Sequence, residues 1–192
     1  MATIPTDKTA VLIMDYQNDI VANHTANDPG LTKRGAKVLD GARQAHIPVI
    51  HVVIRFRDGY PEVGNRGAFK GIKEGGRLKE GSHGAEIHPD VAPKPGDIIV
   101  TRRRTGAFAG SDLEVVLRSQ SRDTLVLMGI ATSGVVLTTL RWAADLDYSL
   151  VVIADCCGDR DPELHRVLTE KVYPRQAAVM TSTEFLAALP KK

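Results

Sequence analysis

Three short segments carry groups that could do acid–base chemistry, and each follows an apolar run. Asp15 ends the first such run, Arg102 follows another, and the turn 129–135 leaves a third. A carboxyl group can donate or accept a proton, and an arginine carries a permanent positive charge. In an open parallel sheet, ligands bind outside the carboxyl ends of the strands. If the runs are parallel strands, the three segments therefore lie around one site.

Each of these features also has a plain structural interpretation. An aspartate after a strand is often a helix cap, an arginine at a strand end often forms a surface ion pair, and Ser133 can cap the helix that follows it. For any one feature alone the structural interpretation is the simpler one. Their joint occurrence at strand ends favours a functional site.

Six runs are apolar continuously rather than alternately, which is typical of strands buried on both faces. Segments with helical periodicity lie between them. This alternation predicts a three-layer α/β/α fold with an open, mainly parallel six-stranded sheet and helices on both faces. A length of 192 residues predicts a single domain over 1–192. The predicted strands are Thr9–Asp15, Pro48–Ile54, Asp97–Thr101, Thr124–Gly129, Leu150–Asp155 and Ala177–Met180.

Helix ends are also marked in the sequence. Ser111-Asp112-Leu113-Glu114 has the spacing of a capping box, and Asp161-Pro162 places a cap before a proline at the first helical position. A last helix is predicted to start near Ser182. By contrast, 55–95 is rich in glycine and charge without clear periodicity, which favours a functional or subunit-contacting loop.

The composition excludes several classes of protein. The chain is 43% hydrophobic and 25% charged with a formal net charge of +2, which is too small to favour binding to nucleic acid or to a membrane surface. No apolar run approaches the roughly 18 residues of a membrane span, and the first residues lack the pattern of a signal peptide. The adjacent Cys156 and Cys157 favour a reducing, cytoplasmic setting.

Several motifs together resemble the isochorismatase-like cysteine hydrolases, and the resemblance runs from about Lys8 to Phe185. Members of that family hydrolyse nicotinamide, carbamoyl compounds, ureido compounds or a vinyl ether. The family resemblance implies a Rossmann-like topology and a homo-oligomer, either a dimer or a tetramer. The matching pieces are Asp15-Tyr16-Gln17-Asn18-Asp19, Arg102-Arg103-Arg104-Thr105-Gly106-Ala107-Phe108, Gly129-Ile130-Ala131-Thr132-Ser133-Gly134 and Asp155.

The resemblance implies a catalytic Asp, Lys and Cys, of which only Asp15 is present as such. The lysine position holds Arg102 and the cysteine position holds Val135, which has no nucleophilic atom. Arg102 is expected to pair bidentately with Asp15 and to lower the pKa of that carboxyl.

Further site assignments also come from the resemblance. They are oxyanion donation by the backbone N–H groups of Ala131 and Val135, substrate binding by Gln17, Phe108 and Thr132, and a cis peptide between residues 130 and 131.

Other groups could supply chemistry in place of the missing thiol. Cys156 and Cys157 follow the fifth predicted strand, but cysteine is among the most frequently buried residues, so a packing role is the simpler interpretation. The histidines at 51, 83 and 88 lack the spacing that zinc-dependent relatives use, so neither a metal nor another cofactor is predicted.

Three functions remain open on the sequence. The first is a hydrolase that acts on a small molecule through Asp15, cleaving an amide or carbamoyl C–N bond or a vinyl ether without a thiol. The second is a catalytically silent pocket that binds a small anion, or an assembly protein on the same fold. A thiol enzyme that uses Cys156 or Cys157 is the third and least favoured alternative.

Overall fold

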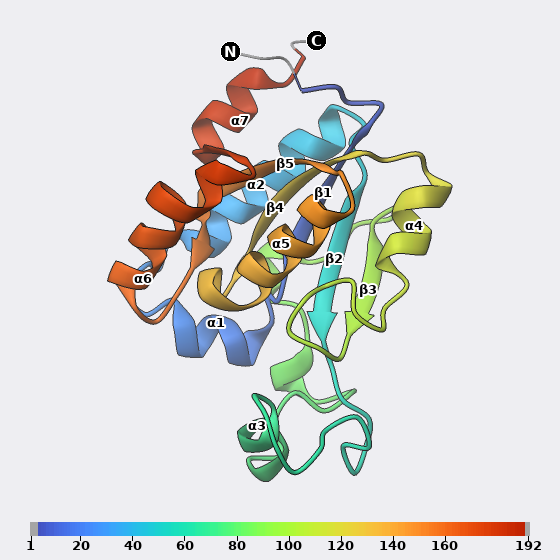
Figure 1. The fold of residues 1–192 in the computed structure, drawn as a ribbon, viewed down its shortest axis with the longest axis vertical. Coiled ribbons are helices and arrows are strands. Elements are labelled where there is room, and N and C mark those ends of the chain that lie inside the picture. Colours follow the sequence, from blue (N-terminus) through green and yellow to red (C-terminus); the bar gives the residue numbers. More distant parts are fainter. Residues whose placement is uncertain (1–3, 191–192) are drawn as a thin grey trace.

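The computed structural model describes residues 4–190 and shows one six-stranded sheet with helices on both faces (Figure 1). The strand order is β3-β2-β1-β4-β5-β6, and every neighbouring pair is parallel. The predicted α/β/α architecture is thus confirmed. The strands are β1 (Thr9–Met14), β2 (Val49–Ile54), β3 (Ile98–Arg102), β4 (Thr124–Ile130), β5 (Ser149–Gly158) and β6 (Ala178–Met180).

The three central strands form the middle of the core. Every residue of β1, β2 and β4 is buried, as a continuous apolar run predicts for a strand covered by helices on both sides. Strand β5 continues to Gly158, three residues beyond its predicted end, and its pairing with β4 shifts register between Leu127 and Gly129. The predicted strands otherwise differ from the observed ones by about one residue at each end.

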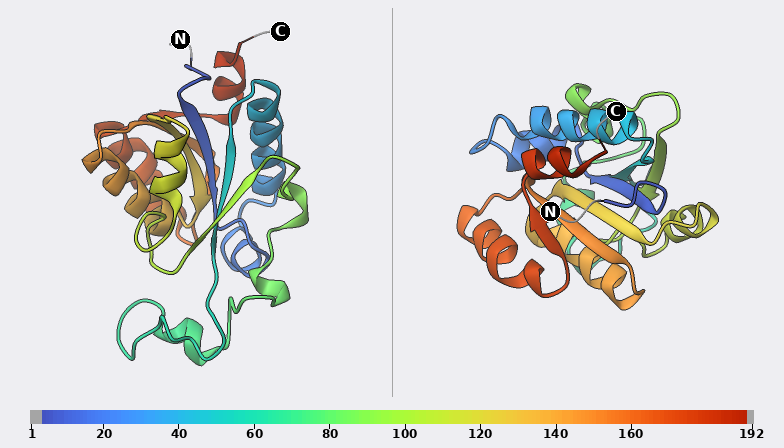
Figure 2. Two further views of the ribbon diagram at one scale, coloured as in Figure 1. Left: turned by 90° about the vertical axis from the view of Figure 1, so that its right-hand side faces the viewer. Right: turned by 90° about the horizontal axis from the view of Figure 1, so that it is seen from above.

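Chain direction decides which helices cover which face. The chain moves from β1 to β2 through α2 in one direction, and from β3 onward in the opposite direction through α4, α5 and α6. Right-handed crossovers then place α2 on one face and α4, α5 and α6 on the other, with α7 beside α2 (Figures 1 and 2). The helices are α1 (Asn18–His24), α2 (Leu31–Gln44), α3 (Lys70–Glu74), α4 (Leu113–Ser119), α5 (Leu137–Asp145), α6 (Pro162–Val167) and α7 (Ser182–Ala188).

The short helical turns complete the chain. They are the 3-10 turns η1 (His83–Ala85), η2 (Pro89–Val91) and η5 (Tyr173–Arg175), and the π-helical turns η3 (Thr132–Val136) and η4 (Leu168–Val172).

Of the two predicted helix caps, one is confirmed and the other forms only in part. Asp161 accepts hydrogen bonds from the N–H groups of Glu163 and Leu164, so this cap is confirmed. The capping box at Ser111 forms only in part: the Ser111 hydroxyl accepts from the Leu113 N–H at 3.2 Å, but it donates to the Ala107 carbonyl and α4 begins later, at Leu113. A capping box does form at α7, where Thr181 and Glu184 bond reciprocally.

The segment 55–95 lies beyond the carboxyl ends of the strands (Figures 1 and 2). It carries α3; a bridge between Phe56 and Lys79 closes the segment on itself, and a bridge between Gln17 and Ile87 holds it to the body. The segment therefore covers the edge of the sheet at which ligands bind in folds of this kind. Within residues 4–190, no helix has the length and apolar character needed to cross a membrane.

Candidate functional site

A buried ion pair joins the ends of β1 and β3. Arg102 donates from Nε to Asp15 Oδ1 at 3.0 Å and from Nη2 to Asp15 Oδ2, which is the predicted bidentate pairing. The third nitrogen, Nη1, donates to the Arg104 carbonyl. Both side chains are almost fully buried. Three of the five N–H groups of the Arg102 guanidinium are therefore engaged with Asp15 and the Arg104 carbonyl, and one N–H on each of Nη1 and Nη2 is left over at the cavity that Arg102 also lines.

The pKa of Asp15 moves against the expectation from its arginine partner. Burial raises the pKa of the Asp15 carboxyl above that of a solvated aspartate, and the Arg102 charge and hydrogen bonds offset this only in part. The predicted lowering of this pKa is therefore wrong. The cost of removing the carboxylate from water exceeds the stabilisation from one cation, so Asp15 is easier to protonate than a surface aspartate.

Asp15 also shapes the local backbone. Its φ is 61°, in the left-handed region where aspartate is more common than most residues, and there the chain turns out of β1 toward α1. The end of the neighbouring strand, β4, is also closely packed. A Cβ atom at Gly129 would lie 3.0 Å from atoms of Met14 and Val136, so a larger residue there would have to push these neighbours apart.

The turn after β4 positions the backbone next to this pair. The peptide between Ile130 and Ala131 is cis, as the family resemblance implied. Ala131, Gly134 and Val135 all line the cavity above Asp15. The N–H of Ser133 points elsewhere, since it donates to Asp159 Oδ2 at 2.8 Å.

The cavity has a volume of ≈ 340 Å³ and is mostly apolar, with a few polar groups. This is within the size range of small-molecule sites. Its floor comes from the strand ends and η3, and its outer wall comes from α1 and the segment 55–95. The lining residues are Asp15, Ile20, His24, Ile54, Ala68, Phe69, Ile72, Arg77, Leu78, Arg102, Thr105, Ile130, Ala131, Gly134 and Val135.

The structure brings together four of the predicted site residues, namely Asp15, Arg102, Ala131 and Val135. The other three lie outside this lining.

Gln17 is fully buried and binds only backbone, donating to Ile54 O at 2.9 Å and Ala85 O at 2.8 Å and accepting from Ile54 N–H at 2.8 Å. It thereby ties β2 to the outer segment.

Phe108 and Thr132 are also held by the protein itself. The Phe108 ring packs on Trp142 and Tyr148, with centroids 6.4 and 6.0 Å apart. Thr132 Oγ1 lies 2.8 Å from His165 Nδ1, and its carbonyl accepts a hydrogen bond from the Tyr173 hydroxyl at 2.6 Å. Both residues stabilise the turn and the helix behind the cavity.

Two polar residues of the cavity could not be found from the sequence. His24 Nδ1 lies 3.1 Å from the Ile20 carbonyl, so Nδ1 carries the proton and Nε2 is left as an acceptor. Burial lowers the pKa of His24, which keeps the ring neutral at pH 7. Arg77 is over a third exposed, and its Nε lies 3.5 Å from Asp19 Oδ2. Neither residue follows a strand, so the rule that located Asp15 does not apply to them.

Neither cysteine thiol is a good nucleophile at neutral pH. Cys156 and Cys157 are both buried, and burial raises the pKa of Cys157 to about 12 and that of Cys156 still further above its ordinary value. At neutral pH both are therefore protonated and poor nucleophiles. Within residues 4–190, no three His, Cys, Asp or Glu side chains are grouped so that they could hold a metal ion; the absence of a metal stays a prediction.

Comparisons with known proteins identify the family of this chain. The family profile described as the isochorismatase domain matches residues 9–184. An isochorismatase family protein of Bacillus subtilis is 32% identical over 93% of this chain and 93% of its own length. The chain belongs to the isochorismatase family.

Two further relatives of this isochorismatase-family chain have more specific names. The ureidoacrylate amidohydrolase of Rhizobium rhizogenes is 30% identical over 84% of this chain and 74% of its own length. The crystal structure of N-carbamoylsarcosine amidase from Thermoplasma acidophilum is similar with a TM-score of 0.75 and 27% identity, covering 91% of this chain and 96% of that one. This chain is thus an isochorismatase-family hydrolase by relationship.

Proposed function

We propose that the protein hydrolyses a small molecule with Asp15 as the acid–base group and without a thiol at position 135. The observation that carries the proposal is the buried Asp15 carboxyl, whose pKa is raised, at the floor of an apolar cavity. General acids in enzymes are often carboxyls whose pKa is raised by burial. Val135 presents only an apolar surface there, so water takes the place of a protein nucleophile.

A protonated carboxyl favours cleavage of a vinyl ether among the bond types that the family hydrolyses. Asp15 would protonate the terminal carbon of the double bond, and the ether oxygen would stabilise the resulting cation. Water adds to that cation and loses a proton to Asp15, and the hemiketal then breaks into a carbonyl compound and an alcohol. For an amide or carbamoyl bond, ionised Asp15 would instead take a proton from the attacking water.

Arg102 and Arg77 have different roles in this proposal. Arg102 gives three of its five N–H groups to Asp15 and the Arg104 carbonyl, so its main role is to orient the acid. Arg77 faces the same cavity with only a long contact to Asp19. It is the cation better placed to bind an anionic group of the substrate, such as a carboxylate. The substrate is therefore proposed to carry a negative charge.

The test is turnover on a panel of small amides, carbamoyl compounds, ureido compounds and an isochorismate-type vinyl ether. For the substrate that is turned over, Asp15→Asn should lower kcat at least about 100-fold, because general acid–base catalysis contributes that much. Asp40→Asn replaces an exposed aspartate and serves as the control. Unchanged turnover in Asp15→Asn would overturn the proposal.

Arg77 can be tested on the same substrate. Arg77→Gln should raise KM about 10-fold while kcat changes little, because one charge-assisted hydrogen bond in binding is worth about that factor. An equal loss with an uncharged member of the panel would show that Arg77 does not recognise charge.

The buried Asp15–Arg102 ion pair also supports a second candidate, a silent pocket that binds a small anion. In this case panel members would bind saturably in calorimetry without any turnover. The double variant Arg102→Lys, Val135→Cys supplies the lysine and cysteine that the resemblance implies. Amidase activity gained by this variant would show that only those two positions separate a silent pocket from an active one.

A further inference from the structure

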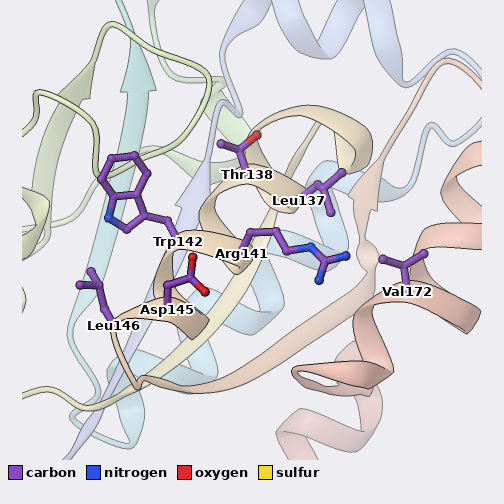
Figure 3. Close-up of a pocket in the computed structure, with 7 residues that line it drawn as sticks. All are labelled: Leu137, Thr138, Arg141, Trp142, Asp145, Leu146 and Val172. Atoms are coloured by element: carbon purple, nitrogen blue, oxygen red, sulfur yellow. The ribbon is translucent and has the colours of Figure 1, made fainter.

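The cavity that holds Asp15 shares one residue with a second, smaller hollow. A groove of ≈ 710 Å³ beside α5 and η4 is larger than either, but no residue that lines it also lines the cavity (Figure 3). A polar pocket of ≈ 90 Å³, the side pocket, lies between the end of α1, the end of β5 and α6. His24 lines both the side pocket and the cavity, and no other lining residue is common to the two. His24 therefore forms part of the wall between them.

The His24 ring is held in the tautomer that makes Nε2 an acceptor. Its Nδ1 donates to the Ile20 carbonyl at 3.1 Å, one turn earlier on α1. Within residues 4–190, no protein group forms a hydrogen bond with Nε2. Burial is the largest influence on the pKa of His24 and lowers it, so the ring is neutral at pH 7. A neutral Nε2 accepts a hydrogen bond, whereas a protonated one cannot.

The side pocket has the size and lining of a water site. Its volume of ≈ 90 Å³ exceeds the roughly 10–15 Å³ that one water molecule needs, so several fit. It is much smaller than the roughly 300 Å³ at which sites for organic ligands begin. Asp28, Asp159 and His165 supply polar groups to its lining. Carboxylate oxygens accept more than one hydrogen bond, so Asp159 can bind water in addition to the Ser133 N–H.

The cavity offers few side chains that could hold a water molecule for attack. Most of its lining is apolar, and Arg77 and Arg102 can only donate hydrogen bonds. Asp15 is occupied by Arg102 and has the acid–base role in the proposed function. The remaining acceptors among the lining side chains are His24 and the Thr105 hydroxyl, and of these only His24 also lines the side pocket.

We propose that His24 holds the water that attacks the substrate, and that the side pocket supplies this water. The inference rests on the proposed function, in which water takes the place of a thiol at position 135. One O–H of the water donates to His24 Nε2, which leaves an oxygen lone pair free to form the new C–O bond. The other proton of the water passes to ionised Asp15. His24 thus positions the water without changing its own charge, and it acts on the chemical step rather than on substrate binding.

Steady-state kinetics on the substrate found with the panel test this role. His24→Leu should lower kcat about 10-fold and change KM less than about threefold, because a hydrogen bond to the reacting water is lost. His24→Gln should keep kcat within about threefold of the wild-type value, because the amide oxygen can also accept from water. His83→Gln replaces an exposed histidine that lines neither space and should have no effect.

Competition with methanol separates the positioning of water from a structural role. In dilute methanol the wild-type protein should form mainly the hydrolysis product, because the water held by His24 is already oriented for attack. In His24→Leu the ratio of methanol adduct to hydrolysis product should rise at least about fivefold, since water loses that advantage. The ratio does not depend on the folded fraction, so a variant that is merely less stable would leave it unchanged.

Two further measurements need no turnover. Nitrogen-15 NMR at pH 7 should show His24 as the neutral tautomer with its proton on Nδ1, and the signals can be assigned by their absence from His24→Gln. A high-resolution crystal structure of the protein should show water hydrogen-bonded to His24 Nε2 and further water in the side pocket.

Four outcomes would each overturn the inference: an unchanged kcat in His24→Leu, an unchanged methanol ratio, a proton on Nε2, or a side pocket without water. Failure of the proposed function gives a different result. If Asp15→Asn lowers turnover while His24→Leu does not, only the role of His24 is refuted. If Asp15→Asn leaves turnover unchanged, the proposed function fails and the role of His24 fails with it.

Discussion

Asp15 and Asp97 are both buried carboxylates paired with an arginine, yet they lie at opposite edges of the sheet. Asp15 follows β1 at the carboxyl edge, at the floor of the cavity, and among residues 4–190 the only hydrogen-bond partner of its carboxylate is Arg102. Asp97 precedes β3 at the amino edge. It accepts from Arg43 at 2.5 Å and from the Lys94 N–H at 2.9 Å, and it lies 3.2 Å from His51 Nε2.

The pKa values of the two acids move in opposite directions. Burial alone would raise the pKa of Asp97, but the hydrogen bonds from Arg43 and Lys94 and the other partners outweigh it, so the value is lowered. At Asp15 burial outweighs a single partner, and the value is raised. The depth of burial and the number of donors together, rather than the presence of an arginine, decide the outcome. Asp97 is built to stay ionised, while Asp15 can be protonated.

The largest expected difference between the acids is in turnover. Asp15→Asn should lower kcat at least about 100-fold, whereas Asp97→Asn should leave the kcat of the folded protein within about threefold, because only Asp15 reaches the cavity. Steady-state rates corrected for the folded fraction by circular dichroism would measure this. Comparable losses in both variants would mean that turnover responds to general disruption of the sheet.

The second difference is in how stability depends on pH. In the unfolded chain both carboxyls have the ordinary aspartate pKa of about 3.9. The lowered pKa of Asp97 stabilises the fold above that ordinary value, and this contribution is lost as the pH falls through the folded value. The raised pKa of Asp15 has the reverse sign, because the folded state binds the proton more tightly. Its contribution is greatest below the ordinary value and is lost as the pH rises through the folded value.

Urea unfolding of both variants between pH 3 and 7 would measure this difference. Asp97→Asn should destabilise by about 3 kcal/mol at pH 7, because it leaves His51 without its acid and Arg43 with only the exposed Asp40, and by less at pH 3. Asp15→Asn should destabilise more at pH 3 than at pH 7. The same pH trend in both variants would contradict the opposite pKa directions.

A smaller effect should follow from replacing each arginine by lysine. Lysine cannot donate two parallel hydrogen bonds to a carboxylate. Arg102→Lys should therefore lower turnover about 10-fold by loosening Asp15, a loss of about 1.4 kcal/mol in activation free energy. Arg43→Lys should cost about 1 kcal/mol of stability and leave turnover unchanged. Steady-state kinetics and urea unfolding of the two variants measure both effects. A loss of turnover in Arg43→Lys, together with a loss of stability but not of turnover in Arg102→Lys, would contradict the roles given to the two arginines.

The sequence predicted the position of the first acid better than its ionisation. Strand periodicity located the sheet and the end of β1, and the family resemblance supplied the pairing of Asp15 with Arg102. The direction of the pKa was missed because it depends on how deeply the carboxyl is buried and how many donors reach it, and neither is visible in the residue types. The contact of Asp97 with His51 could not be predicted either, since the two are 46 residues apart.

The outer wall of the cavity was harder to predict than its floor. The segment 55–95 was identified as a functional or subunit-contacting loop, but no periodicity indicated that Phe69, Ile72 and Arg77 would face Asp15. Loop residues are placed by tertiary contacts, here the bridges at Phe56 and Ile87, rather than by local pattern. Similarly, the Ser111 capping box forms only in part: its hydroxyl accepts from the Leu113 N–H but also donates to the Ala107 carbonyl, a partner outside the motif.

The smallest expected effect concerns the two thiols, whose participation would remove the special role of Asp15. Cys156→Ala and Cys157→Ala should each leave turnover within about twofold, because both thiols are buried and protonated at neutral pH. Native protein should react with iodoacetamide at pH 7.5 far more slowly than urea-unfolded protein, as followed by mass spectrometry. Rapid labelling of the native protein with parallel loss of turnover would instead make a cysteine the nucleophile. Asp15 would then act as its base, and the contrast with Asp97 would no longer rest on a protonated carboxyl.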